Sequence, residues 1–423
     1  MAANSKRVPF PRQHIEQITA EYPTPVYLYD EAGIRASLRR LMKAFSWAPE
    51  FREYFAVKAN PNPYILKLLA DWGAGADCSS MAELLLAERV GLTGARIMFT
   101  SNVTPPEEFV KARELGAIIN LDDIAHLDYL ERHAGLPDLV SFRWNPGRLR
   151  TGNSIIGNPV KAKFGATRAQ ILRAYRLATE RGVRRFGLHT MVVSNELRTE
   201  SFLRTAEMLF TLAVELSRQL GIHLELINLG GGFGIPYEPG QQPVDLAAVG
   251  SGIWHLYERI LLASGHPPAT LAMECGRYIT GPHGYLVSRV RHLKKTYRHY
   301  AGLDATMANL MRPGMYGAYH HISVLGKERK PVHALYDVTG SLCENNDKFA
   351  ERRLLPELSV GDLVILHDAG AHGHSMGFNY NGKLRCAEIL VRPDGSHLLI
   401  RRAEKLDDYF RTIDFRGLAS FGA

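Results

Sequence analysis

A lysine follows directly on an apolar run near residue 55, and its position is the first sign of chemistry in the chain. Residues 54–57 read YFAV, which suits a strand that is buried on both faces, and Lys58 comes immediately after them. An ammonium group at the end of a buried strand costs free energy unless the amine has a partner or a task. Lys58 is therefore a candidate for a reactive amine.

A second group of residues could hold a phosphate. Residues 229–234 read LGGGFG, and consecutive glycines let the backbone approach a ligand closely and direct N–H groups at an anion. The segment lacks the GK[ST] ending of a nucleotide-binding P-loop, and by itself it fits a tight turn equally well. Ser194 and Arg277, on neighbouring predicted strands, make a phosphate pocket the preferred interpretation.

Glu274 places a carboxylate at the end of another predicted strand. A lysine that forms a Schiff base, a phosphate pocket and a partner for a pyridine nitrogen are together what pyridoxal 5'-phosphate requires. A glutamate keeps that nitrogen protonated and the ring electron-withdrawing, which suits loss of CO2, whereas an arginine favours racemisation. The residues therefore favour decarboxylation over racemisation, although Glu274 could instead be an ion-paired core acid.

Short apolar runs alternate with helical patterns from about residue 50 to 275. The eight strand candidates are YFAVK, GADC, RIMFTSN, AIINLDD, LVSFRWNP, RFGLHTMVV, LELINLGGGF and TLAMECGR. Eight strand–helix units favour an α/β fold with a closed (β/α)8 barrel, the TIM barrel, over an open sheet. No GxGxxG follows the first strand, which counts against a dinucleotide-binding fold. In such barrels the chemistry lies where strands end and loops begin.

The pattern changes after about residue 285 to strands separated by turns, as in PVHALYDVTG and GDLVILHDAGA. We predict a cofactor-binding barrel over residues 30–285 and a mostly β, barrel-like domain over residues 286–423, to which residues 1–29 add a strand. The basic segment RVRHLKKTYRHY, residues 289–300, is predicted as a strand with one solvated face.

The composition, with 46% hydrophobic and 22% charged residues, is ordinary for a soluble globular protein. No apolar run approaches the ~18 residues that span a membrane, and the first residues lack the apolar core of a secretory signal. We therefore expect a cytoplasmic protein that binds no membrane. The net charge of +8 is spread along the chain, so a small acidic substrate is a better expectation than nucleic acid.

Cysteine and histidine usage gives no metal signature. The four cysteines, Cys78, Cys275, Cys343 and Cys386, have no CxxC spacing, so neither a disulfide framework nor a zinc site is indicated. The histidine pair at residues 320–321 and the HGH at residues 372–374 have no accompanying carboxylate constellation. We expect no metal.

Taken in order, the motifs resemble those of the fold-type III pyridoxal-phosphate decarboxylases, the diaminopimelate and ornithine decarboxylase group, and above all the diaminopimelate branch. The matching stretches are TPVYLYD, YFAVKAN, GADCSS, KFG, LGGGFG, ECGR, MRPGMYGAYH, GSLCENND and DAGAHGHSMGFNYN, between about residues 24 and 391. The resemblance implies pyridoxal 5'-phosphate as cofactor, a small amino acid as substrate, a place in lysine biosynthesis, and a homodimer with two shared active sites.

The resemblance also implies roles for individual residues. Lys58 would form the Schiff base, Glu274 would pair with the pyridine nitrogen, and Cys343 would protonate the carbanion left when CO2 departs. The cofactor would also contact Ser194, Gly231, Gly232, Arg277, His372 and Met191. The substrate would contact Arg277, Arg312, Tyr316, Glu344 and His372, with Cys343 and Glu344 reaching across the dimer. Without its motif, Cys343 would be interpreted as an inert buried thiol. The alternative for Arg312 is a surface cation.

The chain departs from the family pattern at several positions. Met191 stands where the family has the histidine that stacks on the cofactor ring, and Val193 replaces a glycine. His372 replaces the tyrosine of DAGAY, and Cys275 replaces the proline of EPGR. A methionine can still contact a ring through its sulfur, for about 0.3–1.5 kcal/mol, but it supplies neither a hydrogen bond nor a charge.

These departures predict a divergent member. The first expectation is a decarboxylase of diaminopimelate or of a related amino acid with a polar distal group. The alternatives are a decarboxylase of another amino acid in a specialised biosynthetic pathway and a non-catalytic homologue that binds the cofactor.

Overall fold

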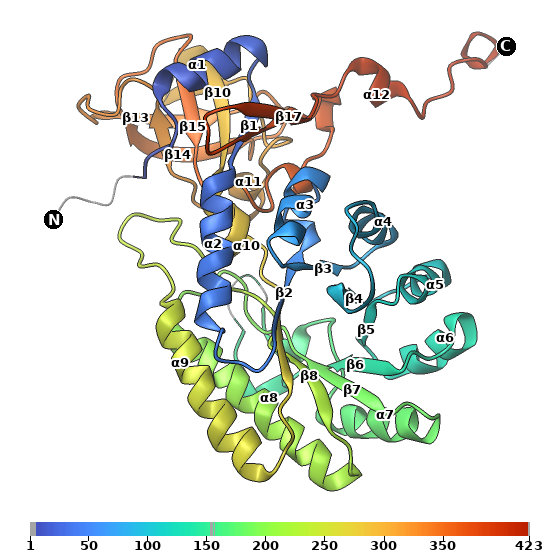
Figure 1. Ribbon diagram of the computed structural model, residues 1–423. Helices are drawn as coiled ribbons and strands as arrows, with labels where there is room; N and C mark the ends of the chain where they lie inside the picture. The colour runs from blue at the N-terminus through green and yellow to red at the C-terminus, as the bar shows by residue number, and fades with distance from the viewer. Residues whose placement is uncertain (1–5, 153–154, 156, 422–423) are drawn as a thin grey trace. The chain divides into compact units, whose positions relative to one another are not determined.

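The computed structural model describes residues 6–152, 155 and 157–421. The chain divides into two compact units (Figure 1). The barrel unit comprises Gly33–Pro236 and Gly240–Pro282, and the β-rich unit comprises Met1–Ala32, Tyr237–Pro239 and His283–Ala423. Among the described residues, no helix is long and apolar enough to cross a membrane.

Eight parallel strands close into a barrel in the first of these units. They are β2 (Phe51–Ala56), β3 (Gly75–Cys78), β4 (Ile97–Ser101), β5 (Ile118–Leu121), β6 (Leu139–Arg143), β7 (Arg185–His189), β8 (Leu224–Asn228) and β9 (Thr270–Met273). Each strand pairs with the next along the chain, and β2 pairs with β9 to complete the ring. The prediction of a (β/α)8 barrel is confirmed, and every predicted barrel strand is present.

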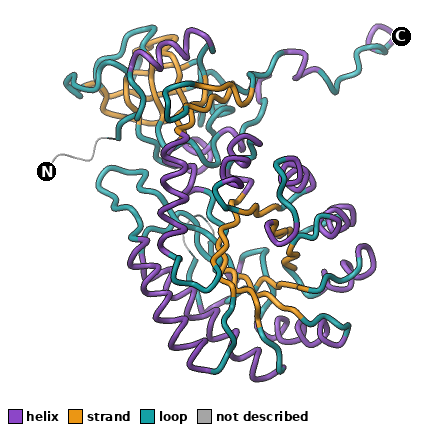
Figure 2. The backbone as a smooth tube through the Cα atoms, in the orientation of Figure 1, coloured by secondary structure: helices purple, strands orange, loops and turns teal. Residues whose placement is uncertain are grey.

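Helices lie outside the barrel strands (Figure 2). They are α2 (Glu31–Ala44), α3 (Pro63–Asp71), α4 (Met81–Arg89), α5 (Pro106–Glu114), α6 (Ala125–Ala134), α7 (Arg168–Glu180), α8 (Thr199–Leu220) and α9 (Leu246–Leu256), and a short α10 (Arg277–Thr280) follows β9. Several begin at polar caps that satisfy the first backbone N–H groups, such as Asn62, Ser80 and the capping box at Thr167. These caps fix where each loop ends and its helix begins.

An apolar cluster fills one layer of the barrel interior. It consists of Tyr54, Met98, Ile118, Leu226 and Ala272, which come from five of the strands. This layer removes apolar surface from water and contributes to the stability of the barrel. Polar residues can therefore occupy the interior positions nearer the strand ends.

The β-rich unit is a nine-stranded sheet. Its strands are β1 (Val26–Asp30), β10 (Gly284–Lys295), β11 (His299–Leu303), β12 (Ile322–Val324), β13 (Ala334–Thr339), β14 (Lys348–Leu355), β15 (Leu363–Leu366), β16 (Ala387–Val391) and β17 (His397–Arg401). The main path runs β14-β13-β11-β10-β1-β16-β17, with β15 pairing to β10 and β12. The unit also contains α1 (Arg12–Glu21), α11 (Arg312–Tyr316) and α12 (Leu406–Phe410).

Strand β1, from the start of the chain, lies in the middle of this sheet. It pairs antiparallel with β10 and parallel with β16. Alternate residues of these strands, such as Val26 and Leu28, enter one apolar cluster with Ile15 and Ile18 of α1. The N-terminal segment therefore belongs to the core of the unit that the C-terminal segment forms.

The basic segment at residues 289–300 differs from its prediction. It is the end of β10 and the start of β11, joined by a turn in which Thr296 N–H donates to the Arg298 carbonyl. Residues 291–299 are exposed on both faces, because this hairpin extends beyond the apolar core of the sheet. The prediction of one strand with a single solvated face is wrong.

Candidate active site

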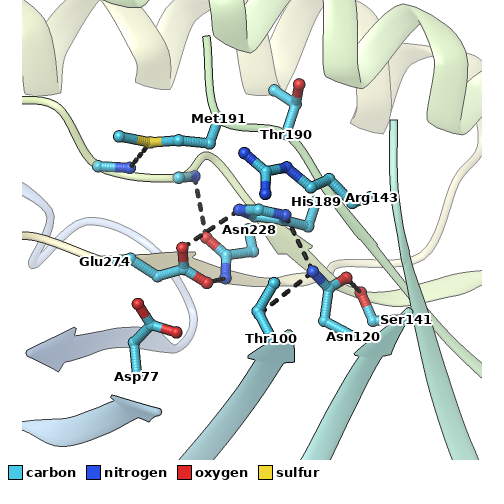
Figure 3. A network of polar contacts seen from close by, with 12 residues as sticks. Asp77, Thr100, Asn120, Ser141, Arg143, His189, Thr190, Met191, Asn228 and Glu274 are labelled. Atoms are coloured by element: carbon cyan, nitrogen blue, oxygen red, sulfur yellow. Dashed lines mark hydrogen bonds and ion pairs between the residues drawn. The ribbon is translucent and has the colours of Figure 1, made fainter. Parts of the chain in front are cut away.

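The carboxyl ends of the barrel strands carry a group of polar side chains, most of which are joined by hydrogen bonds (Figure 3). Its members are Asp77 on β3, Thr100 on β4, Asn120 on β5, Ser141 and Arg143 on β6, His189 on β7, Asn228 on β8 and Glu274 directly after β9. Parallel strands bring their carboxyl ends to the same rim of a barrel. Residues that are far apart in the sequence therefore meet there.

Glu274 is the centre of this group and is buried. Asn228 Nδ2 donates to Glu274 Oε1 at 2.7 Å, and His189 Nε2 lies 3.2 Å from Glu274 Oε2. Burial alone would raise the pKa of this carboxyl, but its contact with His189, the charge of Lys58 and the Asn228 hydrogen bond outweigh it and lower the pKa. Glu274 is therefore a carboxylate at neutral pH, and its contacts fix its orientation.

Asn228 joins this carboxylate to the glycine-rich turn. Its Oδ1 accepts from the Gly230 N–H at 2.9 Å while its Nδ2 faces Glu274. The backbone N–H of Glu274 in turn donates to the Gly230 carbonyl at 2.9 Å. One side chain and one backbone pair thus hold the ends of β8 and β9 together.

Lys58 lies beyond the end of its strand. Strand β2 ends at Ala56, and Val57–Ala59 form a turn of 3-10 helix that leaves the Lys58 side chain 58% exposed. Its Nζ is 3.7 Å from Asp77 Oδ2, and that aspartate side chain is only 3% exposed. The expectation that the lysine is buried at the strand end is wrong, because the chain turns outward one residue earlier.

Asp77 is a buried acid beside this amine. Burial raises its pKa well above the ordinary value, and the nearby Glu274 adds to the rise, while Lys58 opposes it. Its Oδ1 is buried and has no hydrogen-bond partner. An accessible amine therefore stands next to a polar oxygen that a bound group could satisfy.

The glycine-rich turn after β8 packs against the turns that follow β7 and β9. A Cβ on Gly231 would lie 2.2 Å from the Glu274 carbonyl oxygen, and one on Gly232 would lie 2.3 Å from that of Val193. A Cβ on Gly230 would lie 2.3 Å from the Thr190 oxygen, and both Gly230 and Gly232 have positive φ. Glycine is required here because the backbones meet directly.

Met191 contacts this turn. Its Sδ accepts from the Gly231 N–H at 3.2 Å, so the sulfur takes part in a hydrogen bond as an acceptor (Figure 3). Ser194, in the same loop after β7, is partly exposed, and Arg277 is buried at the start of α10. Ser194, Gly231 and Arg277 thus follow three neighbouring strands, β7, β8 and β9.

The other predicted site residues belong to the β-rich unit. Arg312 begins α11 and is 6% exposed; its Nη1 lies 2.9 Å from His320 Nε2, and its guanidinium lies 4.7 Å from the Tyr237 ring centroid. The alternative that Arg312 is a surface cation is therefore wrong. Tyr316, in the same helix, is 63% exposed.

Cys343 and Glu344 are exposed in the loop between β13 and β14. The Cys343 N–H donates to Asn381 Oδ1 at 2.7 Å. Helix α11 packs on this loop, because a Cβ on Gly314 would lie 2.3 Å from the Asn346 carbonyl oxygen. Elsewhere in the unit, His372 is partly buried and has a φ of 54°.

Asn120 and Asn228 were not predicted as site residues. Both interrupt apolar strands, in AIINLDD and LELINLGG, and a buried amide in a strand needs partners. That interruption is the signal that could have identified them. Within the described residues, 6–152, 155 and 157–421, no group of three His, Cys, Asp or Glu side chains could hold a metal ion.

Residues 31–281 match the family described as pyridoxal-dependent decarboxylase, pyridoxal binding domain. The chain belongs to this family. The resemblance predicted from the motifs is thereby confirmed, as are the cofactor class and the decarboxylase class of enzyme.

Relatives match this decarboxylase over most of its length. The Protein TabA of Pseudomonas amygdali pv. tabaci is 45% identical over 407 residues, 96% of this chain and 95% of its own. The diaminopimelate decarboxylase of Methanothermobacter thermautotrophicus is 36% identical over 398 residues, 93% of this chain and 92% of its own. The crystal structure of the M. jannaschii diaminopimelate decarboxylase has a TM-score of 0.87 at 30% identity and covers 94% of both chains.

The strand-end residues fit pyridoxal phosphate. The Lys58 amine is accessible, Glu274 is held ionised, and the buried Asp77 Oδ1 lacks a partner. The glycine turn presents backbone without side chains, which suits the approach of a phosphate. These are the amine, the acid and the anion-binding backbone that this cofactor needs.

Proposed function

We propose that this protein decarboxylates an amino acid with a polar distal group, with diaminopimelate as the best single substrate. The observation that carries the proposal is that the accessible amine of Lys58 and the buried, ionised carboxylate of Glu274 lie at the same rim of the barrel. When bound, pyridoxal phosphate withdraws electrons from the carbon that loses CO2. A residue that stabilises positive charge on the ring strengthens that withdrawal.

In this proposal Lys58 binds the cofactor covalently, and Glu274 contacts its pyridine nitrogen. The phosphate is held by Ser194, Gly231, Gly232 and Arg277, whose positions after β7, β8 and β9 support the assignment. Met191 lies against the glycine turn and contacts the cofactor from that side. His189 and Asn228, which orient Glu274, are not assigned a contact with the cofactor.

The substrate contacts are assigned to the β-rich unit. Arg312 holds the distal carboxylate, since its guanidinium is already fixed by His320 and Tyr237 and loses little freedom on binding. Tyr316 and His372 contribute to the same pocket, and Glu344 binds a substrate ammonium.

Cys343 delivers the proton that replaces CO2. This thiol and Glu344 are exposed in the single chain, whereas a proton donor to a carbanion must be shielded from water. A second copy of the chain would provide that shield, which supports a homodimer with shared sites. The homodimer and the cytoplasmic location stay predictions.

A second substrate class has its own support. Protein TabA, whose name states no substrate, is 45% identical to this chain, against 36% for the diaminopimelate decarboxylase above. Met191 and His372 also replace residues that the family places against cofactor and substrate. These observations favour a decarboxylase of another amino acid in a specialised pathway as the second candidate.

CO2 release from a panel of L- and D-amino acids and from both diaminopimelate isomers separates the two candidates. Turnover of meso-diaminopimelate above the rest of the panel supports the first, and turnover of another amino acid alone supports the second. Mass spectrometry after borohydride reduction checks the cofactor, with a pyridoxyl group expected on Lys58. A bound cofactor with no CO2 release from any substrate would favour the non-catalytic alternative.

A further inference from the structure

A chain of buried hydrogen bonds runs behind Glu274, across the interior of the barrel (Figure 3). Asn120 Nδ2 lies 3.0 Å from His189 Nδ1 and 3.3 Å from Thr100 Oγ1. Ser141 Oγ donates to Asn120 Oδ1 at 2.8 Å. His189 then reaches Glu274, with 3.2 Å between Nε2 and Oε2. Asn120, Ser141 and His189 are almost fully buried, so water does not supply these contacts.

The hydrogen bonds determine where the His189 proton lies. With Asn120 Oδ1 occupied by Ser141, the two hydrogens of Nδ2 point to Thr100 Oγ1 and to His189 Nδ1. A nitrogen that accepts a hydrogen bond carries no proton, and a neutral imidazole has only one N–H. That N–H is therefore on Nε2, the nitrogen that lies beside Glu274.

The opposite orientation of the Asn120 amide is less favourable. In a neutral imidazole it would require the proton on His189 Nδ1 and would turn the Nε2 lone pair toward a carboxylate oxygen 3.2 Å away. Two buried acceptors would then face each other, which costs free energy. When Asn120 donates, its own amide, the Ser141 hydroxyl and His189 Nδ1 all have partners.

We propose that Asn120 and His189 are positioning residues: Asn120 keeps Nδ1 of His189 unprotonated, so that the Nε2–H faces Glu274 and holds its carboxylate in place. The inference deepens the proposed function. It rests on that function only in taking Glu274 as the residue that contacts the pyridine nitrogen of the cofactor. Neutral donors suit this role because they stabilise a carboxylate without cancelling its charge. The charge stays available to a cationic group, as a protonated pyridine would be.

The contact between His189 and Glu274 is close, but it is not an ideal hydrogen bond. The buried Nε2 is within 3.2 Å of the carboxylate, yet its N–H is not aligned for a strong hydrogen bond. Asn228 holds the other oxygen at 2.7 Å. The two donors therefore act on different oxygens of Glu274, and removing one leaves the other in place.

Nitrogen NMR of the protein without substrate tests the proton position directly. The signals of His189 are assigned by their loss in His189→Gln. We expect, at neutral pH, an unprotonated Nδ1 and a protonated Nε2 in the wild type, and loss of this preference in Asn120→Ala. A proton on Nδ1 in the wild type would overturn the proposal.

Two substitutions test the effect on Glu274. His189→Leu removes the N–H, while His189→Gln keeps a side-chain donor that can reach the carboxylate. We expect kcat to fall about 10–100-fold in His189→Leu, the range typical of groups that orient a functional residue, with KM nearly unchanged and most of kcat retained in His189→Gln. His126→Leu is the matched control, since His126 is a partly buried histidine on α6, outside the network.

Infrared spectroscopy supplies a readout that does not depend on turnover. The Glu274 band is identified by its loss in Glu274→Gln, and we expect His189→Leu to shift the carboxylate band or convert part of it to a protonated carboxyl. An unchanged band together with unchanged kcat would overturn the proposal. If His189→Leu does not fold, His189→Gln and the wild-type NMR still decide it. A protein that releases no CO2 from any amino acid refutes the proposed function, while the NMR and infrared results still test this inference.

Discussion

Two buried carboxylates, one in each unit, are held in different ways. Glu274 in the barrel is contacted by an amide and an imidazole, from Asn228 and His189. Glu388 on β16 accepts from the Tyr29 hydroxyl at 2.6 Å and from the Arg401 guanidinium, with His374 Nδ1 3.8 Å away. Burial would raise the pKa of both carboxyls, and their partners lower both.

The difference lies in the charge that remains. The guanidinium of Arg401 neutralises Glu388 inside the sheet, so that acid has no charge to offer a ligand. Glu274 keeps its charge at the rim where Lys58 is accessible. A buried acid beside a histidine is thus a structural element in one unit and a candidate site in the other, and the identity of the remaining partners distinguishes them.

The largest effect should come from the amine of the barrel site. We expect Lys58→Ala to lower kcat about 10⁴-fold or more, because no other group would replace a covalent catalyst. The cofactor should also no longer be fixed to the protein by borohydride, as measured by mass spectrometry. Lys67→Ala is the control, since Lys67 is an exposed lysine on α3 that is paired with Asp71. Activity in Lys58→Ala near that of the control would refute the role of Lys58.

Glu388 and Glu274 should differ most clearly in how much their replacement lowers the free energy of unfolding. Glu388→Ala leaves Arg401 and Tyr29 without their buried partner, so we expect a loss of about 3–5 kcal/mol in the free energy of unfolding. Glu274→Gln should cost only about 1 kcal/mol, because glutamine still accepts from Asn228, but it should lower kcat strongly. Urea denaturation of both variants checks the values. Equal destabilisation would break the distinction between a structural and a functional acid.

An exposed thiol in the β-rich unit should affect one step alone. We expect Cys343→Ala to slow product formation about 10²-fold or more through loss of its proton donor, with cofactor affinity unchanged. Cys343→Ser, which keeps a weaker donor of similar size, is the matched variant. Titration with pyridoxal phosphate and rapid kinetics separate the two effects. Parallel losses in affinity and rate would contradict the assigned role.

The pH dependence of stability should report Glu388. Burial on its own raises the pKa of this carboxyl, but His374, Arg401 and Tyr29 bring it below the ordinary value of 4.5. Its contribution is therefore present above about pH 4.5 and is lost as the pH falls through the lower folded-state value. Urea unfolding at a series of acidic pH values should show a smaller decrease for Glu388→Gln than for the wild type. An identical decrease would mean that Glu388 is not ion-paired in the folded protein.

The smallest effect is expected at Met191. Restoring histidine in Met191→His removes the sulfur contact with Gly231 and adds an aromatic ring, so cofactor affinity should change by about 1 kcal/mol, roughly fivefold. Equilibrium dialysis with pyridoxal phosphate measures the change. A loss of binding altogether would mean that the methionine is essential to the glycine turn.

The barrel could be predicted because its information is local. Apolar runs of strand length alternate with segments of helical periodicity. Eight such strand–helix repeats are compatible with few topologies, of which the closed barrel is one. The β-rich unit was predicted less completely, because β14 reads KFAERRLL. Its many charges suit an edge strand of a sheet and give no apolar run to detect.

The site was predicted only in part, because local sequence patterns locate strand ends but not the contacts between strands. Lys58 and Glu274 stand at strand ends, which the pattern locates, but the exposure of Lys58 depends on one turn of 3-10 helix that no periodicity predicts. Asn120 acquires meaning only when β7 brings His189 beside it, and that register is a property of the closed ring. The motifs identified the reactive residues, whereas the residues that contact them could be identified only in the assembled barrel.

The triple-glycine turn also limits how this chain can diverge. A Cβ at any of its three positions would lie 2.2–2.3 Å from the carbonyl oxygen of Thr190, Val193 or Glu274, so no side chain fits there. A side chain at any of these positions would collide with the backbone of the loop after β7 or of the turn after β9, so this point of the rim is constrained. New substrate preferences are therefore expected from exposed side chains elsewhere, such as those in the loop between β13 and β14 other than Cys343 and Glu344.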